Sequence, residues 1–267
     1  MKIIDSHIHT SFGRKDFLKT AKKIGNKFNE KELYKQLKEN NVVYAISITS
    51  DRTDTTPIEY KKIVELSRKN KRLIGVLGIN PKKIAKDSIK KIEEGIKLGF
   101  IKGLKIYPGY FYTYPNDKAY HKFYGLAEKH DLPVVIHCGD TYKKEALVKY
   151  AHPLNVDDLA VKFPKVKFVI AHLGNPWLLD AAEVVYKNKN VFSDLSGLCI
   201  GNDISPIAKR RIIEAIDYIG DYSKIIYGSD WPLVKMKDYI RFIKTIIPKK
   251  YHKKVFYENA IRLFKLE

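Results

Sequence analysis

Short apolar runs alternate along this chain with longer segments in which apolar residues recur every three or four positions. The short runs are rich in β-branched and aromatic residues, and Gly, Pro, Asn or Asp stands at their ends, as is typical of buried strands. Their near-continuous apolar character indicates a parallel sheet covered by helices. The pattern predicts eight strands, at residues 2–8, 42–49, 73–79, 101–107, 133–138, 166–171, 191–195 and 224–229.

The segments between these runs have the apolar period of amphipathic helices. Asn29, Asp87 and Ser205 are the expected N-caps of three of them, because their side chains can accept hydrogen bonds from free backbone N–H groups. The predicted helices lie at about 29–40, 57–70, 87–98, 117–130, 155–162, 177–188, 204–218 and 236–247, and a final helix lies at about 249–265.

Eight strand–helix repeats in 267 residues favour a closed barrel over an open sheet. No Gly-rich dinucleotide-binding motif follows the first predicted strand, which argues against the main open-sheet alternative. No linker of low complexity divides the chain. We therefore predict the α/β class, with a single (β/α)8 TIM barrel over residues 1–267 and an extra C-terminal helix.

The composition changes this picture in only one respect, the charge. The chain has 50 Lys+Arg against 30 Asp+Glu, a formal net charge of +20, which would suit a polyanionic partner. Only eight of these basic residues are Arg, however, and the lysines are spread over nearly every predicted helix. We interpret the charge as a lysine-rich surface and do not expect nucleic acid as a partner.

Cysteine content and hydropathy limit the class of protein further. Two cysteines, Cys138 and Cys199, are too few for a disulfide scaffold or a four-cysteine zinc module. No apolar run is long enough to cross a bilayer, and the N-terminal segment does not resemble a signal peptide. We expect a cytoplasmic protein without membrane contact, whose oligomeric state is left open, a homo-oligomer included.

Polar residues with metal-binding side chains stand at the ends of four predicted strands. His7 and His9 end the first strand, and because side chains alternate along a strand both are expected to face the barrel interior. His137, His172 and Asp230 stand at the ends of the fifth, sixth and eighth strands. Since the carboxyl ends of the strands form the active-site mouth of such barrels, these side chains are expected to meet there.

Several imidazoles and a carboxylate at one mouth are suited to a borderline-soft divalent metal ion. Zinc is the ion that this set favours, with Mn²⁺, Fe²⁺ or Co²⁺ as alternatives. Any single one of these histidines could equally be a hydrogen-bonded structural residue. Their joint placement at strand ends is what indicates a metal site.

Four sequence motifs resemble those of the amidohydrolase superfamily. They are the Asp-x-His-x-His of residues 5–9, the Val-Val-Ile-His of 134–137, the Val-Ile-Ala-His-Leu-Gly of 169–174 and the Tyr-Gly-Ser-Asp-Trp-Pro of 227–232. The closing Glu-Asn-Ala of 258–260 with Leu263 and Phe264 resembles the tail of the amidohydrolase-2, or decarboxylase-like, branch. The motifs extend over nearly the whole chain, and they are not specific for a substrate.

The resemblance implies a metal-dependent hydrolase with one metal ion held by His7, His9, His137 and Asp230. His172 and Asp230 would be the catalytic residues that act on a metal-activated water, which attacks a C–N or C–O bond of a small polar or anionic substrate. In the decarboxylase members of the branch the same site cleaves a C–C bond, so non-oxidative decarboxylation of a small unsaturated or aromatic acid is the alternative.

Residues near the strand ends are expected to contact the substrate. Lys105, on the fourth strand, corresponds by strand to a carbamylated lysine that bridges two metal ions in binuclear superfamily members. We favour a contact with a substrate anion or with an interior carboxylate over the bridging carbamate, and one metal ion over two. Ser196 and Trp231 are weaker substrate-binding candidates. Asp51 and Arg52 would meet an anionic substrate or cap a loop. The aromatic loop at 107–114 would form a pocket wall or pack locally.

A metal-dependent nuclease similar to the TatD family is a less favoured third function. That family also begins with Asp-x-His-x-His, and the net charge would suit its substrate. Its strand-four glutamate is missing here, because the segment reads Gly-Leu-Lys-Ile-Tyr-Pro at 103–108. The loss of a metal-binding carboxylate is a chemical difference, and it argues against this function.

Overall fold

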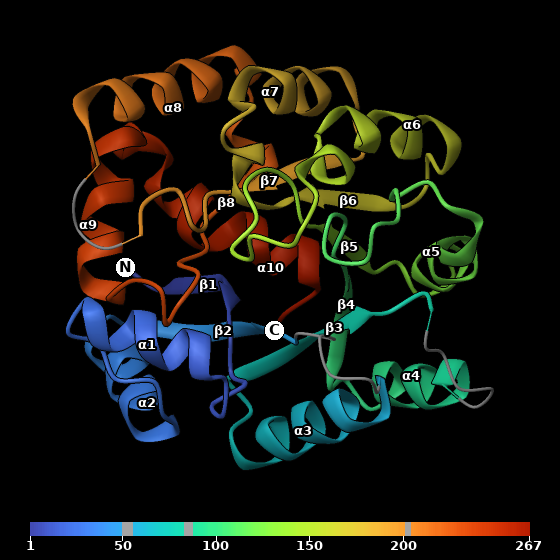
Figure 1. The fold of residues 1–267 in the computed structure, drawn as a ribbon. Coiled ribbons are helices and arrows are strands. Elements are labelled where there is room, and N and C mark those ends of the chain that lie inside the picture. Colours follow the sequence, from blue (N-terminus) through green and yellow to red (C-terminus); the bar gives the residue numbers. More distant parts are fainter. Residues whose placement is uncertain (50–55, 83–87, 201–203) are drawn as a thin grey trace.

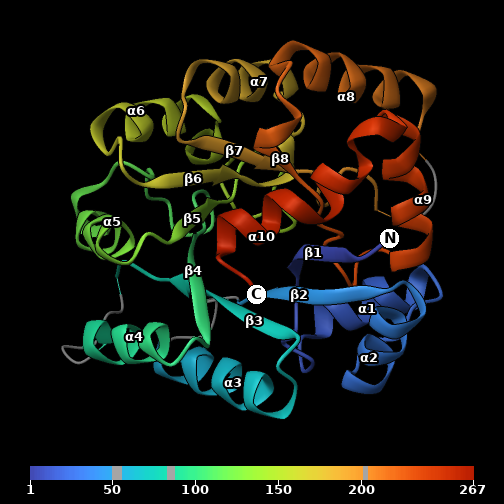
Figure 2. The ribbon, with the colours of Figure 1, turned by 180° about the vertical axis from the view of Figure 1, so that it is seen from behind.

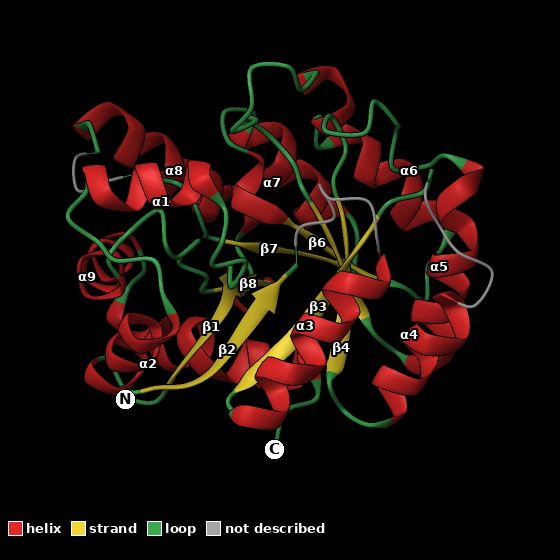
Figure 3. Ribbon diagram, turned by 60° about the horizontal axis from the view of Figure 1, so that its bottom comes forward, coloured by secondary structure: helices red, strands yellow, loops and turns green. Residues whose placement is uncertain are grey.

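The computed structural model describes residues 1–49, 56–82, 88–200 and 204–267. Eight parallel strands follow one another around the sheet in the order of the chain, and helices surround them on the outside (Figures 1 and 3). The eight predicted strands and the TIM-barrel class are confirmed. The strands are β1 (Ile3–Ile8), β2 (Val42–Ile48), β3 (Leu73–Ile79), β4 (Ile101–Ile106), β5 (Pro133–Ile136), β6 (Lys167–Ile170), β7 (Val191–Asp194) and β8 (Ile225–Ile226).

The helices follow the predicted alternation, with one addition before β2. Asn29 and Ser205 cap α2 and α8 as expected, since their side chains accept hydrogen bonds from the N–H groups of Glu32 and Ala208. The predicted cap Asp87 lies outside the described residues. The α-helices are α1 (Lys15–Lys23), α2 (Glu30–Glu39), α3 (Thr56–Lys69), α4 (Ser88–Lys97), α5 (Lys118–His130), α6 (Leu154–Lys162), α7 (Leu178–Lys187), α8 (Pro206–Ile219), α9 (Met236–Ile246) and α10 (Asn259–Phe264).

One helix was missed by the sequence prediction. Helix α1 was not predicted, because only Phe17 and Ala21 of its residues are buried and their apolar period is too short to recognise. The final helix expected at 249–265 is present, and along its length the helix type changes from a 3-10 turn (Lys249–Tyr251) to a π-helical segment (Lys254–Glu258) and then to α10. The carbonyl of Val255 accepts a hydrogen bond from the N–H of Tyr227, which lies outside this helical segment.

The apolar core forms two layers, one between the strands and the outer helices and one inside the barrel. Helix α10 lies across the end of the barrel opposite the carboxyl ends of the strands (Figure 2), and its buried side chains extend the inner layer. The inner layer therefore closes the amino-terminal end of the barrel with apolar side chains. It contains Ile4, Ile46, Val76, Val135, Val169 and Ile226 of the strands together with Ala260, Leu263 and Phe264 of α10.

The barrel closes where β1 meets the segment that follows β8. The N–H of Ser6 donates to the carbonyl of Tyr227, at 2.9 Å, and the register between β1 and β2 shifts between Asp5 and Ile8. Such a shift is a β-bulge, which re-aims the side chains that follow it. Two more backbone hydrogen bonds extend the closure, from Asp230 N to His7 O (2.8 Å) and from His9 N to Trp231 O (2.8 Å).

Asp5 supports this closure from inside the molecule. Its Oδ1 accepts hydrogen bonds from the N–H of Ser229, at 2.8 Å, and from the N–H of His7, at 3.3 Å. Complete burial raises the pKa of Asp5 from 3.8 to about 7, although these hydrogen bonds oppose the change. Asp5 therefore connects the backbone after β8 with that of β1.

The raised pKa of Asp5 predicts that this residue makes the stability of the metal-free protein depend on pH. In the folded protein the Asp5 carboxyl keeps its proton up to about pH 7, whereas in the unfolded protein it loses the proton near pH 3.8. The contribution of Asp5 to the stability of the folded state is therefore lost as the pH rises between these values. One proton corresponds to a slope of about 1.4 kcal/mol per pH unit. Asp5→Asn removes this slope, so the variant should gain stability relative to wild type at pH values above 7 and not below 4.

Urea denaturation of both proteins across this pH range measures the difference. Asp158→Asn, at an exposed aspartate of α6, is the control, and its difference from wild type should not change with pH in this way. A constant difference between Asp5→Asn and wild type across the range would contradict the prediction.

Candidate metal centre

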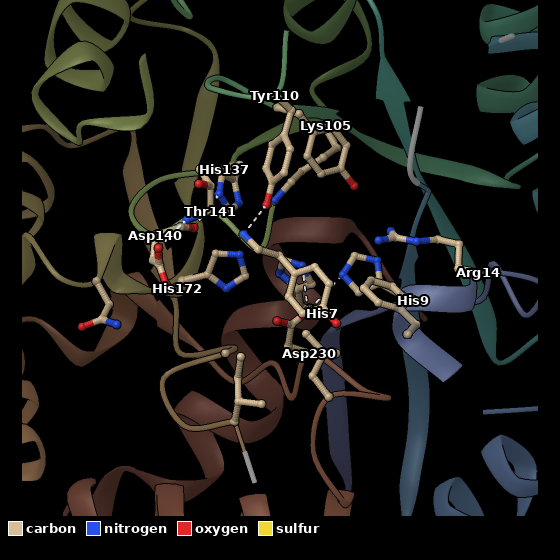
Figure 4. Close-up of a pocket in the computed structure, with 17 residues that line it drawn as sticks. His7, His9, Arg14, Lys105, Tyr110, His137, Asp140, Thr141, His172 and Asp230 are labelled. Atoms are coloured by element: carbon tan, nitrogen blue, oxygen red, sulfur yellow. Dashed lines mark hydrogen bonds and ion pairs between the residues drawn. The ribbon is translucent and has the colours of Figure 1, made fainter. Parts of the chain in front are cut away.

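The carboxyl ends of the strands surround a pocket of about 280 Å³. Each of the five polar residues predicted to meet at the mouth lines this pocket, and so does Lys105 of β4 (Figure 4). The polar residues that the strands bring to the pocket are His7, His9, Lys105, His137, His172 and Asp230.

Three of these residues form a compact group of candidate ligands, with their ligand atoms all within 4.8 Å of one another. The Oδ1 of Asp230 lies 3.0 Å from Nε2 of His9 and 3.8 Å from Nε2 of His7. In Figure 4 the three side chains point toward one another in the pocket. The closure between β1 and the segment after β8 creates this group, since it sets the backbone of Asp230 against that of His7.

The other ring nitrogens of the two histidines are held by acceptors. Nδ1 of His7 lies 2.9 Å from Oδ2 of Asp194, and Nδ1 of His9 lies 3.2 Å from the carbonyl of Ile48. A carboxylate or a carbonyl can only accept, so each Nδ1 carries the hydrogen and each Nε2 keeps its lone pair for a metal ion.

The charge states of this group also fit a divalent metal ion. Burial lowers the pKa of His7 to about 4 and lowers that of His9, so both rings are neutral near pH 7. Burial alone would raise the pKa of Asp230, but the adjacent imidazoles of His9, His172 and His7 hold it below its usual value. Two neutral imidazoles and one carboxylate are a donor set that zinc and similar ions use.

His172 lies beside this group, in the short turn (Ala171–Gly174) that follows β6. Its backbone has a positive φ of 60°, and its N–H donates to Oδ1 of Asp194 at 3.0 Å. Its Nδ1 lies 3.1 Å from the carbonyl of Ser196, which can only accept and so favours the neutral tautomer with the hydrogen on Nδ1 and the lone pair on Nε2. The His172 ring is 4.9 Å from that of His7. A non-glycine residue at such a φ is strained, and strain of this kind is concentrated at functional sites.

His137 reaches the pocket wall but does not join the ligand group. Its Nε2 lies 3.0 Å from the carbonyl of Asp140, and its ring is 5.1 Å from that of His172. Coordination of a metal ion through Nε2 would require the loss of the hydrogen bond to Asp140. The role of His137 as a ligand therefore stays a prediction.

Lys105 is buried in the pocket wall with its ammonium group facing the site. Its Nζ lies 5.2 Å from the ring centroid of Tyr107 and makes no hydrogen bond to any residue that the structure describes. Burial lowers the pKa of Lys105 to about 8, against the effect of Asp194 and Asp230. An ammonium group without a hydrogen-bond partner at this depth is suited to receive an anion.

The structure does not bring Ser196 or Trp231 to the pocket surface. Both are fully buried, and neither lines the pocket. Trp231 packs its ring against Phe12 and Phe28. The hydroxyl of Ser196 forms hydrogen bonds with His172 and Asp194 and is not itself part of the pocket lining. The other candidates for anion contact, Asp51 and Arg52, lie outside the described residues.

Sequence reasoning missed Arg14, which lies just before α1 and lines the pocket. Its Nε donates to Oδ1 of Asp16 at 3.0 Å, its Nη2 to the other oxygen, and its guanidinium lies 3.5 Å from the ring centroid of Phe17. These contacts hold the guanidinium in one place. Arg14 is the first basic residue after the histidine pair, and this position could have suggested a role at the site. Because α1 was not predicted, the sequence did not indicate where the Arg14 side chain points.

The aromatic loop at 107–114 serves both of its expected roles. Tyr107 and Tyr110 line the pocket, and their rings lie 6.4 Å and 5.0 Å from that of His137. Tyr112 and Tyr114 instead pack against Tyr150, away from the site. The first part of the loop is therefore a pocket wall and the second part is local packing.

Gly197 should be essential for the geometry of this site. A Cβ at this position would lie 2.9 Å from Oδ2 of Asp230 and 2.9 Å from Nδ1 of His172, so Gly197→Ala must displace both side chains. We expect at least about a tenfold loss of metal affinity and activity, measured by competition with a chelator and by turnover, as for changes beside a metal ligand.

Gly99→Ala is the matched control for Gly197→Ala. Gly99 also has a positive φ, of 77° against 63° for Gly197, but no atom lies within 4 Å of the Cβ it would gain. Gly99→Ala therefore introduces the same kind of backbone strain as Gly197→Ala but no steric clash of the new Cβ. Equal losses in the two variants would show that the clash is unimportant.

Comparisons with known proteins add to this geometry. No curated protein sequence gives a significant match to the chain. Among the described residues, no helix combines the length and the apolar character that crossing a membrane requires.

Several solved structures share the fold over nearly the whole chain. A probable 2-pyrone-4,6-dicarboxylic acid hydrolase from Acinetobacter baumannii, with citric acid bound, has a TM-score of 0.72 and 19% identity, covering 99% of this chain and 100% of that one. A 2,6-dihydroxybenzoate decarboxylase in complex with 2,6-dihydroxybenzoate has a TM-score of 0.70 and 18% identity, covering 100% of both chains. A 5-carboxyvanillate decarboxylase from Novosphingobium aromaticivorans, in complex with manganese, has a TM-score of 0.72 and 14% identity, covering 96% and 86%.

At these identities the likeness establishes the fold, which is the barrel described above. The family is established by the sequence itself, since the family model Amidohydro_2, described as an amidohydrolase, matches residues 4–266. This range includes each strand end that contributes to the pocket. The chain belongs to the amidohydrolase-2 family of metal-dependent enzymes.

Proposed function

We propose that this chain is a metal-dependent hydrolase that uses water to cleave a C–N or C–O bond in a small anionic substrate. The observation that carries the proposal is the orientation of His172 beside the candidate ligands. In the neutral ring, Nδ1 donates to the carbonyl of Ser196 and Nε2 is left to accept a proton in the pocket. A base next to a metal-binding group is what the activation of water requires.

The metal ion is proposed to be a single Zn²⁺, with Mn²⁺, Fe²⁺ or Co²⁺ as alternatives. His7, His9 and Asp230 would hold it, and His137 is the fourth candidate ligand. A divalent ion in this place supplies Lewis acidity, which lowers the pKa of a bound water from about 15.7 toward about 7. The tautomers of His7 and His9 and the ionised carboxylate of Asp230 prepare the chain for it.

The chain's own groups then move the proton and bind the substrate. Nε2 of His172 takes the proton of the attacking water and returns it to the leaving group, and the carboxylate of Asp230 is the second acceptor within the site. Lys105 and Arg14 provide the positive charge for an anionic group of the substrate. The rings of Phe17 and Tyr110 bound the remaining space.

The size of the pocket limits the substrate to a small molecule. A volume of about 280 Å³ is at the lower end of ordinary ligand pockets. Among the residues that the structure describes, Arg14 and Lys105 are the arginine and the lysine that line it. The other described lysines do not line the pocket, so we propose no nucleic-acid partner.

Non-oxidative decarboxylation is the second candidate function. The fold likeness to two decarboxylases supports it, since one of them covers this chain completely. In that reaction the carbon that loses CO2 must gain a proton, so His172 would act as an acid rather than as a base. The free Nε2 of His172 favours hydrolysis, while the Lys105 ammonium suits either reaction.

Product analysis distinguishes the two functions. The metal-loaded protein is incubated in oxygen-isotope-labelled water with lactones and amides that carry a carboxylate, including a pyrone dicarboxylate, and separately with hydroxylated benzoates. Hydrolysis places the label in the product carboxylate. Release of CO2 without incorporation of label would overturn the hydrolase proposal and support the alternative.

Substitutions of His172 and Asp230 should separate catalysis from metal binding. His172→Ala should retain the metal, because its Nε2 is outside the ligand group of Asp230, and should lower kcat by about 100-fold to 10,000-fold, the range for a general base. Asp230→Ala should lower metal affinity and activity together. Metal content by elemental analysis and turnover of the same samples measure both effects, and full activity in either variant would contradict the assigned roles.

A further inference from the structure

One carboxylate at the end of β7, that of Asp194, connects the ligand group with His172. Its Oδ2 lies 2.9 Å from Nδ1 of His7. Its Oδ1 accepts hydrogen bonds from the N–H of His172 at 3.0 Å and from the N–H of Ser196 at 2.9 Å. The same oxygen also accepts the hydroxyl of Ser196. Asp194 and Ser196 are both fully buried, so water does not compete for these contacts.

The hydroxyl of Ser196 adds a second connection between the two histidines. Its Oγ lies 3.0 Å from Nδ1 of His7 and 2.9 Å from Nδ1 of His172. His7, His172 and Asp194 also satisfy the distance requirement for a metal-binding group. The Ser196 oxygen is within hydrogen-bonding distance of all three, so we interpret the group as a hydrogen-bond cluster rather than as a second metal site.

The positions of the protons in this cluster follow from what each atom can donate. Oδ1 of Asp194 faces the N–H groups of His172 and Ser196, which can only donate, and it also receives the Ser196 hydroxyl, so this oxygen is an acceptor. The single proton of the Ser196 hydroxyl is therefore donated to Asp194. The lone pairs of that hydroxyl then accept from Nδ1–H of His7 and of His172.

We propose that Asp194 and Ser196 are positioning residues that set the tautomers of His7 and His172 together. Each imidazole is kept with its hydrogen on Nδ1 and its lone pair on Nε2, so that His7 is a ligand and His172 is a base. This inference rests on the proposed function for the role of His172, but the tautomer of His7 does not depend on it. One buried carboxylate thus controls both metal binding and proton transfer.

Asp194→Asn is the test, because an amide has nearly the same shape and a different hydrogen-bonding capacity. The amide oxygen takes the Oδ1 position, where two backbone N–H groups need an acceptor, so the amide NH₂ faces Nδ1 of His7. His7 must then accept at Nδ1 and carry its hydrogen on Nε2, which blocks coordination there. We expect the affinity for Zn²⁺ to fall by about 10-fold to 100-fold, the range for lost partners of metal ligands.

Nitrogen NMR of the metal-free protein reports the tautomers directly. In Asp194→Asn, His7 should change from the Nδ1–H to the Nε2–H tautomer. His9 is the internal control, because its Nδ1 donates to the backbone carbonyl of Ile48 and does not contact Asp194. Asp158→Asn is the control variant for metal affinity, which should not change. An unchanged His7 tautomer together with unchanged Zn²⁺ affinity would overturn the proposal.

Ser196→Ala keeps the proposal falsifiable if Asp194→Asn does not fold. In this variant the contact between Asp194 and Nδ1 of His7 remains, so Zn²⁺ affinity should change by less than about threefold. Nδ1 of His172 loses the hydroxyl and keeps only the backbone carbonyl of residue 196 as its acceptor. We expect a mixture of His172 tautomers and a lower kcat with an unchanged KM, both restored by Ser196→Thr. A purely Nδ1–H form of His172 in Ser196→Ala would contradict the role of the hydroxyl. If the tautomers change as expected but no substrate is hydrolysed, the proposed function fails and this inference stands.

Discussion

The site depends on the closure of the barrel between β1 and the segment after β8. Strand β8 is short, and the hydrogen bond from the N–H of Asp230 to the carbonyl of His7, at 2.8 Å, continues the closure beyond it. This contact sets a carboxylate that is far away in the sequence against the first histidine pair. Gly228 makes the approach feasible, because a Cβ there would lie 2.7 Å from the Cβ of His7. The candidate ligand group therefore depends on the fold as well as on the local histidine pair.

Burial gives the polar groups of the site their chemical states. Imidazoles that are removed from water stay neutral, while carboxylates beside them stay ionised because hydrogen bonds and positive charges compensate the loss of hydration. His7 and Asp230 are examples of the two cases. The free energy for this arrangement comes from the surrounding apolar layers, which bury the strands on both faces. The same low-polarity setting would strengthen the proposed interaction of Lys105 and Arg14 with an anionic substrate.

The sequence predicted the fold and the polar residues that the strands bring to the pocket, but it did not indicate Arg14 or the detailed roles. Alternation along a strand predicted that His7 and His9 face the same side, and both line the pocket, although the register between β1 and β2 shifts between Asp5 and Ile8. Alternation does not extend beyond the end of a strand, where His172 and Asp230 have positive φ values that no periodic pattern indicates. For the same reason Ser196 could be placed near the site, but its burial outside the pocket lining could not be predicted from the sequence.

The end of the barrel opposite the pocket contains no part of this chemistry. Helix α10 fills it with Leu263 and Phe264, which pack on the inner layer and share no hydrogen bond with the pocket residues. Substitutions that improve the packing of α10 change residues that share no hydrogen bond with the pocket residues. Their effects on stability should therefore be close to independent of substitutions in the pocket. For protein engineering, the barrel thus offers one end for raising thermal tolerance and the other for changing substrate range.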